Sequence, residues 1–156
     1  MYATAAFAEA PWSAGPDQAL INPGGALDYL TLGSLVLERV RLLRAQGLAP
    51  GQVVMTPDAP ALDLVEMQHS LARLGAILFP FRAGLERSEF DALARMTGAE
   101  WVWLPDAARL QRQGHAQSEA DAADAQGIRL MIRTSGSSGQ PRAAMLTAGA
   151  FLASAS

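Results

Sequence analysis

The sequence predicts an α/β fold with a mainly parallel sheet and helices on both of its faces. Short runs of apolar residues at 52–55, 76–79 and 101–104 alternate with segments in which apolar residues recur at helical spacing. Strands that are apolar throughout are typical of parallel sheets whose two faces are both covered. The 156 residues, half of them hydrophobic, are enough for one domain with a buried core.

The N-terminal region is predicted to form a hairpin and then a helix. Apolar pieces at 19–22 and 27–29 flank a turn at 23–25. The spacing that follows predicts a helix that starts at a Thr31 cap and ends at Gly47. Its apolar stripe comprises Leu32, Val36, Val40 and Leu43, and the arginines expected on its solvent side are Arg39, Arg41 and Arg44.

The middle of the chain has a β-α-β-α-β pattern. The expected order is a strand at 52–55, a helix from Asp58 and Pro60 to Leu74, a strand at 76–79, a helix at 87–96 and a strand at 101–104. Gly75 suits the end of the first of these helices, whose stripe comprises Leu64, Met67, Leu71 and Leu74. Trp101 and Trp103 lie two residues apart on a strand, so we expect both on one face of the sheet, in the core.

The C-terminal region ends in a strand, a loop and a helix. Residues 105–127 are rich in Ala, Asp, Gln and Gly, and we expect a partly helical surface connection there. A strand is predicted at 128–132 and a helix from Leu146 to Ala155. Between them lies the stretch TSGSSGQPR, residues 134–142. The sequence therefore predicts a strand–loop–helix unit with a loop rich in glycine and hydroxyl groups.

This loop has the chemistry of a phosphate site. Glycines let backbone N–H groups converge on an anion, hydroxyls add donors, and a following helix would direct its positive end toward the anion. Arg142 adds a fixed positive charge. The loop lacks the Gly-Lys-Ser/Thr of the common P-loop and the G-x-G-x-x-G of dinucleotide sites.

The loop closely resembles the phosphate-binding signature of the adenylate-forming superfamily, which includes acyl-CoA synthetases, luciferases and nonribosomal peptide synthetase adenylation domains. Residues 134–141 match the pattern T-S-G-[ST]-[ST]-G-x-P position by position, and residues 145–147 match the approach to the family's next helix. More diffuse similarities at 27–29, 51–54 and 74–80 follow the family's order. The resemblance covers about residues 19–150.

The resemblance implies that residues 1–156 are the N-terminal portion of the large domain of an ATP-dependent ligase, of the acyl- or aryl-CoA synthetase type. In this family the loop binds the β- and γ-phosphates of ATP while a carboxylic acid attacks the α-phosphate, which gives an acyl-adenylate and pyrophosphate. Coenzyme A or the phosphopantetheine of a carrier protein then accepts the acyl group. The implied ATP-binding residues are Thr134, Ser135, Gly136, Ser137, Ser138, Gly139 and Arg142; no catalytic residue and no metal ligand is assigned.

Two positions depart from the family pattern. Arg142 replaces the loop lysine, and Ala148 replaces a histidine after Thr147. The family's adenine-binding segment, magnesium-binding glutamate, ribose-binding aspartate and catalytic lysine lie beyond this loop, so we expect no ligase activity from residues 1–156 alone. Such a portion should expose an apolar face to the remainder of the enzyme, or associate with itself. The alternative is a natural short or degenerate homologue that acts as a non-catalytic binding or assembly module.

Composition excludes several other classes. A net charge of −3 and the absence of a basic cluster do not suit a nucleic-acid partner. The chain has no cysteine for disulfides or thiolate sites, and no apolar run of about 18 residues for a membrane span. We expect a cytoplasmic protein. Histidines without nearby partners and acids in a polar stretch are expected to be structural or solvated; these are His69, His115, Asp121 and Asp124.

Overall fold

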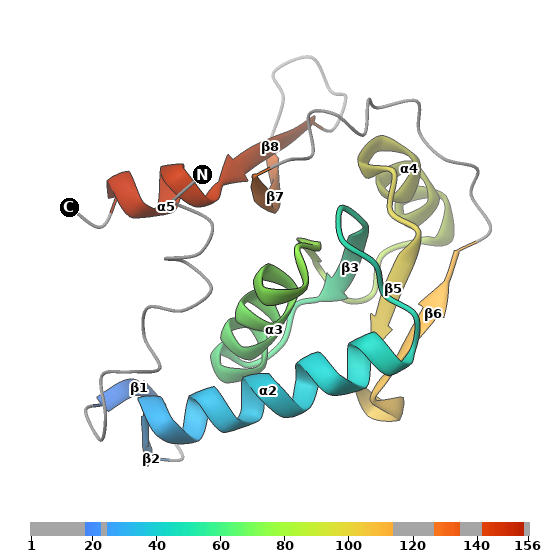
Figure 1. Cartoon of the computed structure of the whole chain (residues 1–156). Coiled ribbons are helices and arrows are strands. Elements are labelled where there is room, and N and C mark those ends of the chain that lie inside the picture. Colours follow the sequence, from blue (N-terminus) through green and yellow to red (C-terminus); the bar gives the residue numbers. More distant parts are fainter. Residues whose placement is uncertain (1–17, 23–24, 114–126, 135–141, 155–156) are drawn as a thin grey trace.

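The structure of the chain is a computed structural model that describes residues 18–22, 25–113, 127–134 and 142–154 (Figure 1). The first described elements are two antiparallel strands, and helices and strands follow them along the chain. The elements are β1 (Gln18–Asn22), β2 (Gly25–Asp28), α2 (Tyr29–Ala45), β3 (Val53–Pro57), α3 (Ala61–Leu74), β4 (Ile77–Phe81), α4 (Arg87–Thr97), β5 (Trp101–Leu104), a 3-10 turn (Pro105–Ala107), β6 (Arg109–Arg112), β7 (Ile128–Thr134), β8 (Arg142–Thr147) and α5 (Ala148–Ser154).

A six-stranded sheet in the order β6-β5-β3-β4-β7-β8 forms the centre of the fold. The inner strands β5, β3, β4 and β7 are parallel, and β6 and β8 pair antiparallel at the two edges. The prediction of a mainly parallel sheet is therefore confirmed, with antiparallel edges that the strand pattern had not indicated.

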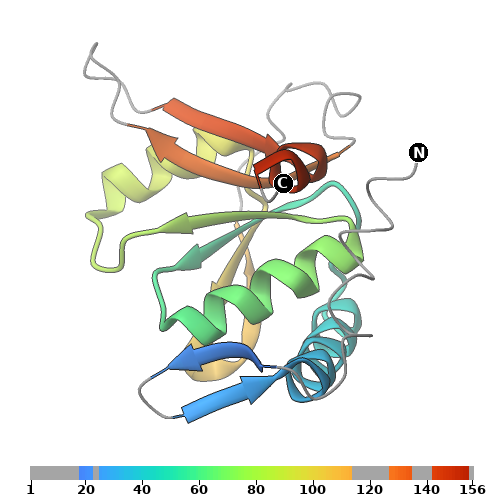
Figure 2. The ribbon, with the colours of Figure 1, turned by 90° about the vertical axis from the view of Figure 1, so that its left-hand side faces the viewer.

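Helices cover both faces of this sheet, as predicted. The chain moves from β3 to β4 in one direction and from β4 back past β3 to β5 in the other. Because such crossovers keep one hand, the reversal sends α3 and α4 to opposite faces. Figure 2 shows α2 and α3 on one side of the sheet, with the β1–β2 hairpin next to them.

Alternate residues of the inner strands divide the core into two clusters. Val54 of β3 and Trp103 of β5 pack with α2 and α3, whereas Val53 and Met55 pack with α4 on the other face. Trp101 packs against the same cluster as Trp103, which confirms that the two tryptophans share one face in the core.

The ends of the helices follow from local chemistry. Thr31 does not cap α2: Asp28 does, and its Oδ1 atom accepts a hydrogen bond from the Thr31 N–H at 2.7 Å. Asp28 serves better because its carboxylate lies three residues before that N–H, at the position where a side chain can reach it. Gly75 ends α3 with φ +70°, as predicted, and a Cβ atom there would lie 3.3 Å from Pro50 Cβ.

Two further predictions were wrong, and a third holds only in part. Within the stretch predicted as a partly helical surface connection, residues 105–107 form a 3-10 turn, whereas residues 109–112 form strand β6. They do so because they pair with β5 from Trp101↔Arg112 to Leu104↔Arg109, a contact that local composition does not encode. The helix predicted from Leu146 begins only at Ala148, because residues 142–147 pair with β7. Arg39 does not face solvent, since its side chain is only 18% exposed and pairs with Glu66 of α3.

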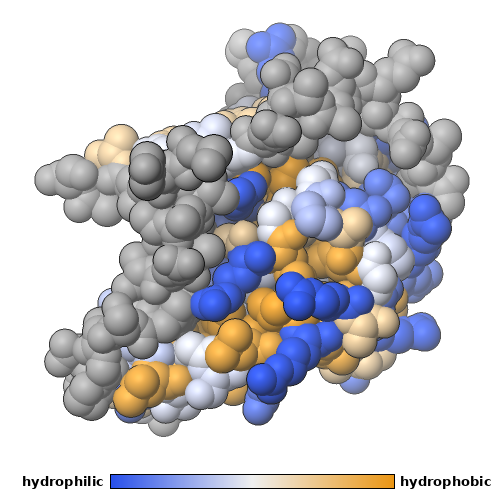
Figure 3. All heavy atoms as spheres, viewed as in Figure 1, coloured by the Kyte–Doolittle hydropathy of each residue, from blue (hydrophilic) through white to orange (hydrophobic). Residues whose placement is uncertain are grey.

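Exposed apolar side chains occur at several places on the surface. In Figure 3, hydrophobic patches lie among hydrophilic side chains on the face seen in Figure 1. Large apolar side chains that are at least a third exposed are Ile21, Leu30, Leu37, Leu42, Ile132 and Met145. Within the described part of the chain, no helix combines the length and the apolar character that a membrane span requires.

Candidate functional site

The predicted phosphate loop connects the two strands of a hairpin. β7 and β8 pair antiparallel, and the last pair of residues in their ladder is Thr134 and Arg142. The Thr134 hydroxyl donates a hydrogen bond to the Arg142 carbonyl oxygen at 3.4 Å. The structure thus brings together the two residues at the ends of the loop. The other predicted phosphate ligands lie outside the described residues: Ser135, Gly136, Ser137, Ser138 and Gly139.

The loop leaves the sheet at its carboxyl edge. β7 is parallel to β4, so Thr134 lies at the same edge as Pro57, Phe81 and Leu104, where the other inner strands end. In open α/β sheets, ligands bind outside the carboxyl ends of the strands. The position of the hairpin therefore agrees with a role for the loop in ligand binding.

The helix expected to follow the loop lies elsewhere. The six residues of β8 separate Arg142 from Ala148, where α5 begins. At about 3.3 Å per residue, β8 places the start of α5 roughly 20 Å from the loop. The expectation that the dipole of the following helix acts on the loop is therefore wrong.

Polar contacts fix the surroundings of the hairpin. Arg133 Nη1 lies 2.7 Å from Glu89 Oε1, which joins β7 to α4. Asp58, predicted at the start of a helix, instead accepts a hydrogen bond at Oδ1 from the Ala83 N–H at 2.7 Å. That bond holds the connection after β4 against the connection after β3, so two of the loops at the carboxyl edge support each other.

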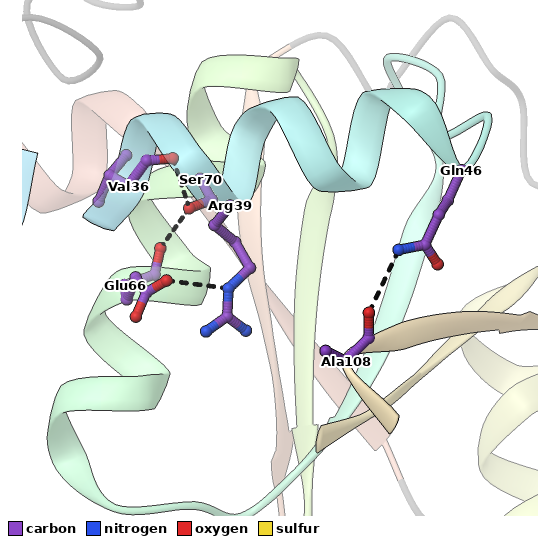
Figure 4. A network of polar contacts seen from close by, with 6 residues as sticks. All are labelled: Val36, Arg39, Gln46, Glu66, Ser70 and Ala108. Atoms are coloured by element: carbon purple, nitrogen blue, oxygen red, sulfur yellow. Dashed lines mark hydrogen bonds and ion pairs between the residues drawn. The ribbon is translucent and has the colours of Figure 1, made fainter. Parts of the chain in front are cut away.

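A partly buried arginine–glutamate pair joins α2 to α3 (Figure 4). Arg39 Nε donates to Glu66 Oε1 at 2.9 Å, and the Arg39 guanidinium lies 4.8 Å from the centre of the Trp103 ring. Burial raises the pKa of Glu66 above its usual value, and the charge of Arg39 opposes that change. The hydroxyl of Ser70 donates to the backbone carbonyl oxygen of Glu66 at 2.7 Å, a bond within α3 that does not involve the Glu66 carboxylate.

A cavity of about 160 Å³ lies beside this pair. It opens at the carboxyl ends of β3 and β5. No sequence motif predicts it, because its walls come from four separate parts of the chain: α2, the end of β3 with the connection after it, α3, and the end of β5 with the turn after it. Its lining residues are Arg39, Thr56, Pro57, Ala59, Asp63, Met67, Trp103, Pro105 and Ala108.

Two ionisable side chains, those of His69 and Arg129, lie largely inside the fold. His69 lies in α3, as predicted, and burial together with the charge of Arg73 lowers its pKa. Arg129, for which the sequence predicts no role, is 6% exposed, and its Nη1 atom donates to the Ile128 carbonyl oxygen at 2.9 Å. His115, Asp121 and Asp124 lie outside the described residues. Across the ranges that the structure describes, no three His, Cys, Asp or Glu side chains gather as metal ligands would.

Curated proteins with similar sequences decide the family. No family model matches the chain. Feruloyl-CoA synthases from Amycolatopsis sp and Streptomyces sp are each 32% identical to it, in alignments that cover 86% of the chain. The chain belongs to the adenylate-forming superfamily. It spans 31% of the length of these two relatives.

Solved structures of adenylate-forming enzymes share the fold of this chain. The N-terminal subdomain of Klebsiella oxytoca NpsA superposes with a TM-score of 0.68 at 19% identity, over 91% of this chain and 41% of that one. MatB from Rhodopseudomonas palustris gives a TM-score of 0.73 at 16% identity, over 99% of this chain and 36% of that one. A Mycobacterium tuberculosis fatty acyl CoA synthetase gives 0.68 at 19% identity, over 93% and 34% of the two chains. At these identities the likeness shows the adenylate-forming fold alone.

Proposed function

We propose that the chain is the N-terminal portion of a ligase that activates a carboxylic acid with ATP and passes the acyl group to coenzyme A. The 32% identity to two feruloyl-CoA synthases carries this proposal. The hairpin that holds TSGSSGQPR at the carboxyl edge of the sheet supports it. Coenzyme A is preferred over a carrier protein as the acceptor because both relatives are named as CoA synthases.

In this proposal the loop binds the β- and γ-phosphates of ATP. A carboxylate oxygen of the acid attacks the α-phosphorus, the bond from that phosphorus to the bridging oxygen breaks, and pyrophosphate leaves. The loop then stabilises the negative charge that develops on the leaving group, through backbone N–H groups, hydroxyls and Arg142. The thiol of coenzyme A next loses its proton and attacks the acyl carbon, and AMP leaves with the electron pair of the broken C–O bond.

The hairpin gives this loop fixed ends. The Thr134–Arg142 pair fixes the separation of the two strands at the base of the loop. Fewer loop conformations then compete with the one that surrounds a phosphate, which reduces the entropy lost on binding. Magnesium, adenine and ribose ligands would come from the remainder of the protein, so we expect no ligation by residues 1–156 alone.

Exposed apolar residues of the hairpin fit a longer protein. Met145 pairs with the buried Met131, and Ile132 pairs with Ala144, so Met145 and Ile132 lie on opposite faces of the hairpin. Their side chains are 56% and 40% exposed. Apolar side chains on both faces of an edge hairpin are expected where further structure covers them. In this proposal the remainder of the ligase covers them.

Pyrophosphate exchange in the full-length protein tests this function. The double variant Ser137→Ala, Ser138→Ala removes two hydroxyls of the loop, and we expect acid-dependent exchange of labelled pyrophosphate into ATP to fall about 100-fold. The matched control is Ser34→Ala, because the Ser34 hydroxyl donates to the Leu30 carbonyl oxygen within α2, away from the loop. Unchanged exchange in the double variant would contradict the proposed role of the loop.

A non-catalytic homologue is the second candidate. The observation that favours it is Ala148, which is 2% exposed and stands where the family has a histidine. A buried methyl group there provides no polar group near the base of the hairpin. If this candidate is right, the full-length protein will bind its partner yet show no pyrophosphate exchange with any acid, even when circular dichroism shows that it is folded.

A further inference from the structure

The cavity beside Arg39 has the size of a small ligand. Its volume is about 160 Å³, which is comparable to the cavity of about 150 Å³ that holds one benzene molecule in an engineered protein. The cavity lies at the carboxyl ends of β3 and β5, between the sheet and α3. Its size therefore limits an occupant to about one aromatic ring with one small substituent.

Arg39 contributes to the wall of this cavity a guanidinium group that Glu66 holds in position. Its Nε atom donates to Glu66 Oε1 at 2.9 Å, and its Cζ atom lies 4.8 Å from the centre of the Trp103 ring. In Figure 4 the two terminal nitrogens lie beyond the Nε–Glu66 contact, and neither takes part in a marked interaction. They have no hydrogen-bond partner among the residues that the structure describes. A guanidinium whose one edge is already fixed keeps a rigid pair of donors for a planar carboxylate.

Thr56 offers the same cavity a hydroxyl without a partner. The residue is 3% exposed, lines the cavity, and its Oγ1 atom makes no hydrogen bond within the described part of the chain. Most buried polar side chains are satisfied, so a buried hydroxyl left open calls for an explanation. A ligand oxygen that accepts from Thr56 would satisfy it.

The other lining residues favour a ligand whose remaining part is apolar. Pro57, Met67 and Pro105 are apolar and suit a flat hydrocarbon surface. Asp63, whose residue is exposed, repels an anion from its side of the cavity, so a negative group is favoured only at the end where Arg39 and Thr56 lie. Inorganic phosphate would leave the apolar walls uncovered, whereas an aromatic acid would use both kinds of wall.

We propose that this cavity binds a small planar organic carboxylate, with its oxygens on the terminal nitrogens of Arg39 and on the Thr56 hydroxyl. This inference does not depend on the ligase function, because it concerns residues of α2, β3 and β5 and needs no ATP. Affinity will be in the millimolar range, since benzoate has only about nine non-hydrogen atoms and the acidic groups nearby oppose it.

Nuclear magnetic resonance of the 156-residue chain tests this site without ATP. Sodium benzoate is the probe, benzamide is its neutral counterpart, and the signals to follow are the Trp103 indole N–H and the Arg39 Nε–H. We expect saturable shifts of both signals with benzoate, and binding of benzamide that is at least about tenfold weaker. Shifts that do not saturate, or equal binding of benzamide, would overturn the proposal.

Substitution of Thr56 gives an independent readout. Thr56→Val keeps the shape and removes the open hydroxyl, so we expect about tenfold weaker benzoate binding and a higher melting temperature in the absence of ligand. Thr97→Val is the matched control, because the Thr97 hydroxyl is buried but bonded to the Leu93 carbonyl oxygen at 2.9 Å, in α4 on the other face of the sheet. Unchanged benzoate affinity in Thr56→Val would contradict the proposal, and the benzamide comparison decides it if that variant fails to fold.

Discussion

Thr134 and Arg142 face each other as the last pair of the β7–β8 ladder, at the base of the predicted phosphate loop. Eight positions apart in the sequence, they are held by backbone pairing and by the bond from the Thr134 hydroxyl to the Arg142 carbonyl. The backbone of Arg142 is therefore held in a strand where the loop ends, which places its charged side chain beside the loop.

The charge of Arg142 should matter more than its shape. In the full-length protein, Arg142→Ala should reduce pyrophosphate exchange by about tenfold or more, because a charge-assisted contact to phosphate is lost. Arg142→Lys restores the residue that the family usually has and should stay within about threefold of wild type. Arg112→Ala on β6 is the control. The Arg112 side chain is 72% exposed, and its ion pair with Glu100 is long, with 3.6 Å between Nη2 and Oε2. Equal losses in Arg142→Lys and Arg142→Ala would contradict this account.

Removing only one partner of the Arg39–Glu66 ion pair should destabilise the fold. Arg39→Met leaves a nearly buried carboxylate without its cation, which should lower the free energy of unfolding by about 3 kcal/mol. Adding Glu66→Gln to that variant should recover most of the loss, because no unpaired charge remains. Urea denaturation of the two variants measures both values. A double variant as unstable as Arg39→Met alone would show that the loss comes from packing.

The pH dependence of stability should contain a contribution from Glu66. Burial raises the pKa of Glu66 above its usual 4.5, so the folded chain binds this proton more readily than the unfolded chain does. Protonated Glu66 therefore contributes to the stability of the folded state. This contribution is complete below about pH 4.5, the pKa of the unfolded chain, and is lost as the pH rises through the pKa of Glu66 in the folded chain. Glu66→Gln stays neutral, so its stability relative to wild type should increase between pH 4.5 and pH 7. A variant that instead loses stability relative to wild type over this range would contradict the direction of the shift.

Gly75 should tolerate no side chain. It ends α3 with φ +70°, and an added Cβ atom would lie 3.3 Å from Pro50 Cβ. Gly75→Ala should therefore destabilise the chain by about 1–2 kcal/mol. Gly149→Ala is the control, because it lies in α5 and its added Cβ atom would be no nearer than 3.8 Å to another group, so we expect a gain of about 0.5 kcal/mol. Thermal denaturation of both variants measures the difference, and equal effects would contradict this reading of Gly75.

The sequence predicted the inner sheet because each part carries a local signal. The strands β3, β4 and β5 are short apolar runs, and α3 has one apolar stripe that ends at a glycine. Periodicity and end residues depend only on neighbours in the chain, so they can be recognised without knowledge of the fold.

The edges of the sheet could not be predicted in this way. β6, with the sequence RLQR, and β8, with the sequence RAAMLT, have mixed or alanine-rich compositions that do not favour strands. They are strands because β5 and β7 provide backbone partners. The same limit applies to Arg39, whose partner Glu66 lies 27 positions away, and to the open hydroxyl of Thr56. The loop motif was recognised from its own residues, and its place at the carboxyl edge followed only from the structure.

Isotope transfer from the acid to AMP tests the proposed ligase most directly. The full-length protein would be given ATP, coenzyme A and an aromatic acid, such as ferulic acid, labelled with ¹⁸O in both carboxylate oxygens. If the carboxylate attacks the α-phosphorus, one labelled oxygen will appear in AMP, and the pyrophosphate will be unlabelled. Label in inorganic phosphate together with ADP, or thioester formation with unlabelled AMP, would contradict the adenylate mechanism.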